Sequence, residues 1–359
     1  MRPLRIAQIV LPWISLPPQG YAGTERIVYH LTEELVRRGH QVTLFASGDS
    51  HTSAKLESVI PKALGLQGKV IETMQTSFYP LMHVARAYEL ADQFDIIHSH
   101  AQFLSLPFSA ASKTPVIHTF HRQFEFDTQE ERDIIAAYGS KLLFTSISNA
   151  QRVDGVQFVD TVYNGVDTGA YVPSPTHPTR DYLFWAGRVT DKKGPEEAIK
   201  VAKHVKMNLV MAGEVTDMEY FEKKIRPHID GVHIQLAQHE NREHIINLYQ
   251  NAKVTLVPTK WNEPFGLVPV ESMSCGTPAV SYDRGGVSET IADGTGFLVN
   301  EAEGVEGLVR RVKQILDMSP DQFGDMSEKA RTHVVEHFSI GAMTDGYERV
   351  YDRVVNKQV

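Results

Sequence analysis

The sequence predicts an α/β protein with two doubly wound domains, each a parallel β-sheet covered by helices. Short apolar runs that are typical of buried strands alternate with longer segments whose apolar residues have helical spacing. This alternation stops at a proline-rich segment near the middle of the chain and then begins again. The 359 residues exceed what one hydrophobic core usually spans, and the hydrophobic content of 42% is enough for two cores.

The first predicted domain covers residues 1–172. It opens with a buried strand at 5–10, RIAQIV, and a helix at 24–39, in which Ile27, Leu31 and Leu35 share one face. Gly39 is expected to end this helix. Further strands are expected at 41–47, 95–100, 115–120 and 141–148. The repeated order of strand, helix and strand predicts a parallel sheet that is covered on both faces.

A linker is expected at 173–181, PSPTHPTRD, because it has three prolines and no large apolar residue. The second domain then covers 182–338. Its expected strands are 182–187, 208–213, 232–237, 254–258 and 278–282, with helices from about 195 and near 218–226 and 241–251. A last helical pattern lies in 339–359, and we expect it to pack back on the N-terminal domain.

The composition excludes several classes of protein. A net charge of −8, from 36 basic and 44 acidic residues, argues against a nucleic-acid-binding protein. Cys275 is the single cysteine, so no intrachain disulfide can form and a reducing compartment is expected. No apolar stretch of 18 residues occurs, and the apolar run before Pro12 is shorter than a signal-peptide core. These features predict a cytoplasmic protein without a transmembrane segment, and contact with a membrane surface stays open.

Ligands of doubly wound sheets bind beyond the carboxyl ends of the strands, and two such domains that face each other form a cleft. The loop after the first strand contains Gly20 and Gly23 just before a helix, and glycines there let the backbone approach a ligand. The alternative is an ordinary turn in which Thr24 caps the helix. Glu25 is either a ligand contact or an acid that interacts with the helix dipole.

A basic turn follows the strand at 182–187. Arg188 comes directly after this strand, Lys193 lies five residues later, and Gly194 precedes the next helix. Arginine offers a planar fork for a phosphate and lysine a point charge. The alternative is a basic turn whose side chains are all solvated. For Lys192 we expect a solvated side chain in either case.

The stretch 261–280, WNEPFGLVPVESMSCGTPAV, places Glu263 and Glu271 on either side of a predicted helix start. Free amide groups of Gly266, Leu267 and their neighbours would face a phosphate. A buried carboxylate at Glu271 would need hydrogen-bond donors, and ribose hydroxyl groups are suitable. Glu263 could bind sugar hydroxyl groups. The alternative is a capping acid followed by a solvated helical glutamate.

Four histidines lie near the ends of two adjacent strands: His98, His100, His118 and His121. Their spacing does not match a closed metal site, so no metal and no other cofactor is predicted. We expect His100 or His121 to contact a substrate hydroxyl group and the others to be structural.

Five segments, in order, resemble motifs of the retaining glycosyltransferases of family 4, and the resemblance covers nearly the whole chain. The most specific is EPFGLVPVE, which resembles the E-x7-E motif of that family. The other four segments are GYAGTERIVYHLTEELVRRGHQVTLFASGD at 20–49, YNGVD at 163–167, GRVTDKKG at 187–194 and RGGVSETIADGTGFLV at 284–299. This resemblance implies the GT-B fold, in which two Rossmann-like domains face an interdomain cleft.

The resemblance also implies roles for the donor-side residues. Arg188 and Lys193 would bind the donor diphosphate. Glu271 would hold the ribose, and Glu263 would bind the transferred sugar. The remaining donor contacts would come from Gly23 and from the backbone of Phe265, Gly266 and Leu267.

His121 would lie near the reacting sugar, as a catalytic residue together with Glu263, Arg188 and Lys193. His100, Thr24 and Glu25 would lie on the acceptor side. The chain departs from the family pattern at Ala237, where a glycine is usual, and in the first loop, which has GYAG in place of a glycine pair.

The implied function is a metal-independent, retaining hexosyltransferase that uses a nucleotide sugar, with UDP-glucose as the expected donor. Residues 1–172 carry 14 basic and 17 acidic side chains, which favours a small soluble acceptor over an anionic membrane. The first loop is similar to a subgroup that includes enzymes glucosylating pterins. A glycan or lipid-linked acceptor is the alternative. A nucleotide-sugar epimerase and a non-catalytic nucleotide-sugar-binding protein are the alternatives from other classes.

Overall fold

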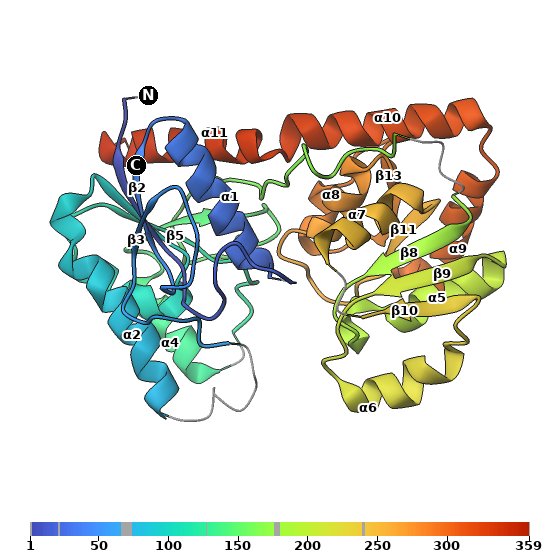
Figure 1. Ribbon diagram of the computed structural model, residues 1–359, viewed down its shortest axis with the longest axis horizontal. Helices are drawn as coiled ribbons and strands as arrows, with labels where there is room; N and C mark the ends of the chain where they lie inside the picture. The colour runs from blue at the N-terminus through green and yellow to red at the C-terminus, as the bar shows by residue number, and fades with distance from the viewer. Residues whose placement is uncertain are drawn as a thin grey trace. The chain divides into compact units, whose positions relative to one another are not determined.

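The computed structural model describes residues 2–20, 22–65, 74–126, 128–175, 180–238 and 241–358. The chain divides into two compact units, Met1–Gly165 with Ile340–Val359 and Val166–Ser339, which we call the first and the second unit. Each unit has its own parallel sheet with helices on its faces (Figure 1). The predicted fold class, with two doubly wound Rossmann-like domains, is therefore confirmed.

The first unit contains a seven-stranded parallel sheet with the order β3-β2-β1-β4-β5-β6-β7. The direction of this order reverses between β1 and β4, which makes the carboxyl ends of these two strands the expected place for a ligand. The strands are β1 (Arg5–Ile9), β2 (Gln41–Phe45), β3 (Lys55–Glu57), β4 (Ile96–Ser99), β5 (Val116–Thr119), β6 (Leu143–Ser146) and β7 (Phe158–Thr161).

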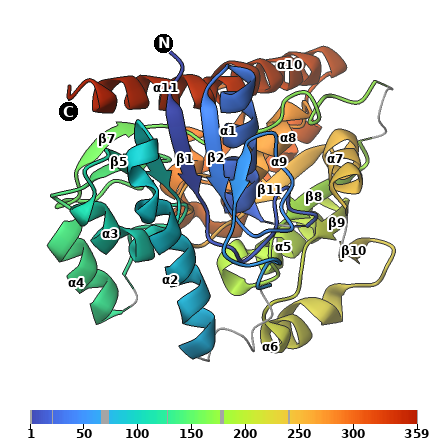
Figure 2. The same cartoon turned by 60° about the vertical axis from the view of Figure 1, so that its left-hand side comes forward.

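The helices of the first unit come from both ends of the chain. They are α1 (Gly23–Arg37), α2 (Met74–Glu89), α3 (Leu106–Ala111), α4 (Gln129–Tyr138) and α11 (Ile340–Val355). Helix α11 lies beside α1 (Figure 2). Arg38 joins the two helices, because its guanidinium pairs with Glu34 near the end of α1 and with Asp345 and Glu348 of α11. Gly39 has a φ of +92°, which suits the residue that ends α1.

The second unit contains a six-stranded parallel sheet with the order β10-β9-β8-β11-β12-β13. Here the order reverses between β8 and β11. The strands are β8 (Tyr182–Ala186), β9 (Asn208–Ala212), β10 (Ile234–Ala237), β11 (Val254–Val257), β12 (Ala279–Tyr282) and β13 (Gly296–Val299).

Successive side chains of β8 enter two different cores, as expected for a strand that is buried on both faces. Leu183 and Trp185 pack with residues of α5 and α9, whereas Phe184 packs with residues of α7 and the segment after α8. The helices of the second unit are α5 (Pro195–Val205), α6 (Met218–Tyr220), α7 (Arg242–Asn251), α8 (Leu267–Ser274), α9 (Gly304–Leu316) and α10 (Pro320–His337).

The chain crosses between the units after Gly165 and again after Ser339. The first crossing precedes residue 172, the expected domain end, because residues 166–172 already pack in the second unit. Val166 forms a bridge with Ser339, and Tyr171 packs against Phe184 and Tyr249. Residues 176–179 of the expected linker at 173–181 lie outside the described residues.

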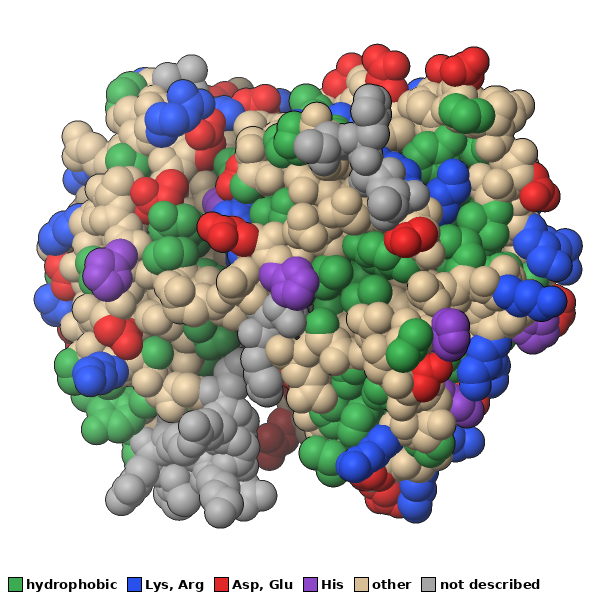
Figure 3. Space-filling model, turned by 45° about the vertical axis from the view of Figure 1, so that its right-hand side comes forward, with side chains coloured by type: hydrophobic (Ala, Val, Ile, Leu, Met, Phe, Trp, Pro, Cys, Tyr) green, Lys and Arg blue, Asp and Glu red, His purple; other side chains and the backbone are tan. Residues whose placement is uncertain are grey.

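Among the described residues, no helix is both long enough and apolar enough to cross a membrane. The face drawn in Figure 3 shows Lys and Arg side chains scattered among acidic and hydrophobic ones.

Candidate functional site

The candidate site of the second unit is built at the carboxyl ends of β8 and β11, where the strand order reverses. Arg188 follows β8 after one glycine, and residues 258–266 follow β11 and lead into α8. Parallel neighbouring strands bring these two loops to the same edge of the sheet.

Lys193 is the cation that both loops hold in place. Its ammonium group forms an ion pair with Glu263, and the two side chains are only 13% and 12% exposed. Thr259 donates a second hydrogen bond to the same carboxylate oxygen, at 3.4 Å. The ammonium nitrogen also lies 5.3 Å from the ring centre of Trp261, in cation–π range. The two residues predicted to bind diphosphate and sugar are thus direct partners.

Gly194 allows the turn that carries Lys193 to pack against the end of β11. Its φ is +67°, and a Cβ atom there would lie 2.0 Å from the carbonyl oxygen of Pro258. No other residue type fits this position without movement of the backbone. The indole N–H of Trp185 donates to the carbonyl oxygen of Lys193 at 3.1 Å and secures the turn from the side of β8.

The other basic residues of this edge have different environments. Arg188 is exposed, and in the described part of the chain nothing pairs with its guanidinium. Lys192 is exposed as well, as expected for a solvated side chain. Lys260 forms ion pairs with Asp191 and Glu197. Arg188 and Lys192 therefore both have charges available to an anion, and Arg188 is the one that follows the end of β8 after a single glycine.

The start of α8 lies next to the Lys193–Glu263 pair. Gly266 precedes the helix with a φ of +106°, and no side chain caps the helix. The first amide groups of a helix have no partner inside it and favour an anion. The 263–266 loop is held by Gly286, whose N–H donates to the carbonyl oxygen of Glu263 at 2.7 Å. A Cβ atom at Gly286 would lie 2.5 Å from the carbonyl oxygen of Pro264, so only glycine permits this contact.

Two tyrosines hold Glu271 inside α8. Tyr171 donates to one carboxylate oxygen at 3.1 Å, and Tyr249 donates to the other at 3.0 Å. Burial and the nearby carboxylate raise the pKa of Tyr249 well above its usual value, so this tyrosine stays a donor. The carboxylate of Glu271 was expected to need hydrogen-bond donors from a ligand, whereas the protein itself supplies two donors.

In the first unit, the histidines that follow β4 and β5 are hydrogen-bonded to each other. Nε2 of His121 lies 2.9 Å from Nδ1 of His100. His121 is half-buried, and His98, His100 and His118 are buried. Burial lowers the pKa of His121 to about 4, that of His118 to about 3 and those of the other two well below the usual value, so all four are neutral near pH 7.

The first loop differs in detail from the expectation. Helix α1 begins at Gly23 with Ala22 at the N-cap, and no side chain caps it. Thr24 therefore lies within the first turn and is not the cap. Glu25 is half-buried in that turn, and burial raises the pKa of its carboxyl group.

The structure thus groups the predicted residues in two sets. The second unit holds Arg188, Lys193, Glu263, Phe265, Gly266, Leu267 and Glu271, and the first unit holds Gly23, Thr24, Glu25, His100 and His121. Sequence reasoning missed the partners of these residues. They are Gln8, which is hydrogen-bonded to His100, and Tyr171, Tyr249, Thr259 and Trp261, which contact Glu271, Glu263 and Lys193. Of these, only Gln8 has a local signal, because a lone polar residue in an apolar strand needs a buried partner.

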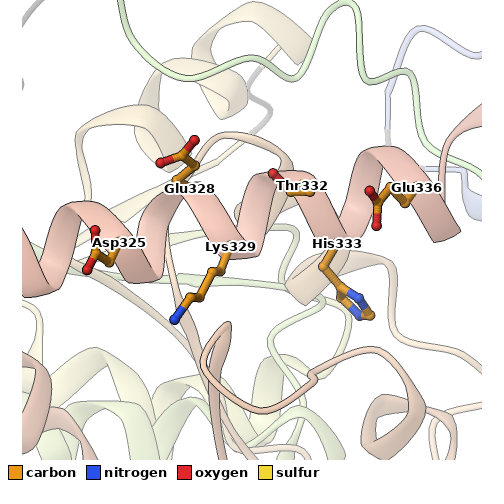
Figure 4. A pocket seen from close by; sticks show the side chains of 6 residues that line it. All are labelled: Asp325, Glu328, Lys329, Thr332, His333 and Glu336. Atoms are coloured by element: carbon orange, nitrogen blue, oxygen red, sulfur yellow. The ribbon is translucent and has the colours of Figure 1, made fainter.

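A surface pocket of the second unit lies along α10, lined by Asp325, Glu328, Lys329, Thr332, His333 and Glu336. Figure 4 shows Lys329 and His333 extending to the same side of the helix. The pocket shares no residue with the predicted set. Among the described residues, no three His, Cys, Asp or Glu side chains are grouped to hold a metal ion.

Two family descriptions match consecutive parts of the chain. "Glycosyl transferases group 1" matches residues 172–333, and "Glycosyltransferase Family 4" matches residues 21–170. The first match contains the Lys193–Glu263 pair, and the second contains His121.

Individual proteins are similar over nearly the full length. D-inositol 3-phosphate glycosyltransferase of Mycolicibacterium gilvum is 25% identical over 388 residues, which cover 94% of this chain and 87% of that protein. Sucrose-phosphate synthase from Thermosynechococcus elongatus has a TM-score of 0.80 at 19% identity, covering 98% of this chain and 99% of the other. Anabaena HepE in complex with UDP and glucose has a TM-score of 0.72 at 17% identity, covering 97% and 99%.

Proposed function

The chain belongs to glycosyltransferase family 4 and has the GT-B fold, and we propose that it is a retaining hexosyltransferase with UDP-glucose as its donor. The observation that carries this proposal is the ion pair of Lys193 with Glu263, beside the exposed Arg188 and the uncapped start of α8. Cations and amide groups suit the diphosphate, and the carboxylate suits sugar hydroxyl groups. That HepE was solved with UDP and glucose supports this choice of donor.

In the proposed reaction, an acceptor hydroxyl oxygen bonds to the anomeric carbon as the bond from that carbon to the diphosphate breaks. The acceptor proton passes to a phosphate oxygen on the same face of the sugar, so the configuration is retained. Arg188, Lys193 and the first amide groups of α8 would stabilise the charge that develops on the leaving diphosphate. These groups do the work that a metal ion does in other transferases, so we propose a metal-independent reaction.

We propose a small soluble acceptor, such as a pterin, which would bind to the first unit near His100, Thr24 and Glu25. The relative named for D-inositol 3-phosphate supports a small polar acceptor. A lipid-linked acceptor is the second candidate, because α2 exposes an apolar group: Phe78, Tyr79, Leu81 and Met82.

The test is a thermal-shift series with UDP-, GDP- and ADP-glucose, followed by an acceptor screen in the presence of EDTA. We expect UDP-glucose to raise the melting temperature most, and transfer to continue with EDTA. Glu263→Gln should keep the shift caused by UDP but abolish transfer, because its proposed contact is to the sugar. No shift with any nucleotide sugar would contradict the proposal. Conversion of the donor sugar without an acceptor would indicate an epimerase, and binding without turnover would indicate a non-catalytic protein.

A further inference from the structure

A row of polar side chains crosses one face of the first unit's sheet. Gln8 of β1 is opposite His98 of β4, and Thr119 of β5 is opposite Thr145 of β6. All four are fully buried. Side chains alternate along a strand, so residues two positions farther on point to the same side, as His100 does after His98. Polar groups at this depth must be hydrogen-bonded to one another.

The hydrogen bonds form one continuous chain. His121 Nε2 lies 2.9 Å from His100 Nδ1, and His100 Nε2 lies 3.0 Å from Gln8 Oε1. Gln8 Nε2 donates to the hydroxyl oxygen of Tyr351 in α11 at 3.1 Å. That hydroxyl lies 2.7 Å from His98 Nδ1, and His98 Nε2 lies 2.7 Å from the hydroxyl of Thr119.

Each member of this chain determines the proton position of the next. The Oε1 atom of Gln8 can only accept, so His100 must carry its proton on Nε2. A neutral His100 then has an acceptor at Nδ1, so the proton of His121 must be on Nε2. At the other end, Gln8 donates to Tyr351, and the single proton of Tyr351 goes to His98 Nδ1. All the bonds therefore run in one direction.

We propose that Gln8 is a positioning residue that, through His100, holds His121 in the Nε2–H tautomer and leaves its Nδ1 to accept a hydrogen bond from a substrate hydroxyl group. The substrate contact rests on the proposed function. The proton positions rest only on the hydrogen-bond chain, because Nδ1 of His121 makes no hydrogen bond with the described residues. Burial supports the assignment, since it lowers the pKa of His121 to about 4 and keeps the ring neutral, with one N–H.

The proton positions can be measured directly in the full-length protein with ¹⁵N-labelled histidine. Long-range ¹H–¹⁵N correlations distinguish the two neutral tautomers. We expect the Nε2–H form for both His100 and His121. In Gln8→Met, which keeps the size but removes the acceptor, His121 should populate both tautomers. In Gln8→Glu, the acceptor remains and His121 should stay in the Nε2–H form. Thr145→Val is the matched control, since it removes a buried hydrogen bond beyond the far end of the chain.

The second readout is turnover of UDP-glucose, as release of UDP. Gln8→Met should lower kcat/KM by about tenfold, the effect of one misdirected hydrogen bond, with partial recovery in Gln8→Glu and no change in Thr145→Val. An Nδ1–H form of His121 in the wild type would overturn the proposal, and so would unchanged tautomers in Gln8→Met. If the wild type does not turn over UDP-glucose, the proposed function fails, while the NMR result still decides what Gln8 does.

Discussion

Three basic residues within one short turn of the second unit differ in what surrounds them. Arg188 and Lys192 are both exposed and form no ion pair with the described residues, whereas Lys193 is bound to Glu263. A solvated basic turn would treat the three alike. The ion pair of Lys193 is the structural difference, and the effects of alanine at the three positions would separate a binding site from a solvated turn.

We predict that alanine at Arg188 or Lys193 lowers transfer by on the order of a hundredfold, because each cation would face the leaving diphosphate. Lys192→Ala should stay within about twofold of the wild type, because Lys192 is not among the residues that we propose to bind the diphosphate. Steady-state kinetics with UDP-glucose measures both effects.

The free energy of unfolding of the same variants provides the control for these kinetic measurements. Lys193→Ala leaves the half-buried carboxylate of Glu263 without its ion pair, and should cost about 1–3 kcal/mol in the free energy of unfolding. Arg188→Ala should cost almost nothing, because no partner is lost. Equal kinetic effects at all three positions would contradict the proposed role of this turn.

The sequence identified the charged site residues but not their partners. Arg188, Lys193 and Glu263 could be selected because they follow buried strands, whose carboxyl ends lie at one edge of the sheet. Tyr171 and Tyr249, which hold Glu271, come from segments 100 and 22 residues away from it in the chain. Contacts at such separations follow from packing, which no local pattern encodes.

At the scale of single elements, the turn that carries a site residue tolerates substitution less than a helix does. The turn between β8 and α5 needs Gly194, whose φ of +67° and contact with Pro258 exclude a side chain. Gly324, in the second turn of α10, has an ordinary φ, and a Cβ atom added there would have no atom within 4 Å. Alanine substitutions at Gly194 and Gly324 therefore form a matched comparison of a position that excludes a side chain with one that accepts it.

Gly194→Ala should destabilise the protein by at least about 1–3 kcal/mol, the usual cost of a strained backbone, and should displace Lys193. Gly324→Ala should stabilise it by about 0.5–1 kcal/mol, because alanine favours the helix. Chemical denaturation measures both. A neutral effect of Gly194→Ala would show that the turn can move away from β11.

The buried histidine face of the first unit predicts a dependence of stability on pH. The folded-state pKa values of His98, His100, His118 and His121 all lie below the ordinary histidine value of 6.5. Unfolding therefore takes up protons once the pH falls below about 6.5. These histidines therefore do not lower the free energy of unfolding above about pH 6.5. They lower it progressively as the pH falls toward about 4 and, for His118, toward about 3.

Melting temperatures between pH 8 and pH 4 should show this loss. The variant His118→Gln removes one of the titrating rings and should make the decline shallower than in the wild type. Identical slopes for the two proteins would contradict the assignment.

The strands predicted from buried apolar runs are confirmed, whereas β3, β7 and β13 were not predicted. β1, β4, β5, β8 and β11 all occur where the sequence places them. β3 and β7, in contrast, have no fully buried residue. Both lie at the edges of the sheet, where pairing with one neighbour is enough. The segment after β12 forms a short 3₁₀ helix, Gly285–Glu289, because Gly285 and Gly286 pack against the 263–266 loop.

At the scale of the whole molecule, the two units differ in whether one continuous segment of the chain forms them. The second unit is one continuous segment, Val166–Ser339, whereas the first needs Ile340–Val359 as well. Tyr347 and Tyr351 of α11 are fully buried in the first unit. The sequence pattern predicted the C-terminal helix, but which sheet it covers depends on contacts such as Tyr351 with Gln8 and His98.

We predict that residues 166–339 fold when they are expressed alone and that residues 1–165 do not. The shorter first-unit fragment would expose the polar row that Tyr351 covers. Thermal melts followed by circular dichroism should be cooperative for 166–339 and for a fusion of 1–165 with 340–359 through a flexible linker. A cooperative melt of 1–165 alone would show that α11 is dispensable.

The late position of α11 also bears on how the protein is made. Domains generally fold in the order of synthesis, the N-terminal one first. Here the ribosome completes the second unit while the first still lacks its last helix, so we expect the part translated first to mature last. Until then the nascent chain would carry an unfinished sheet that chaperones can bind. Protease digestion of stalled nascent chains of increasing length would reveal the order: resistance of residues 166–339 should come first, and that of residues 1–165 only after Val355 has left the ribosome.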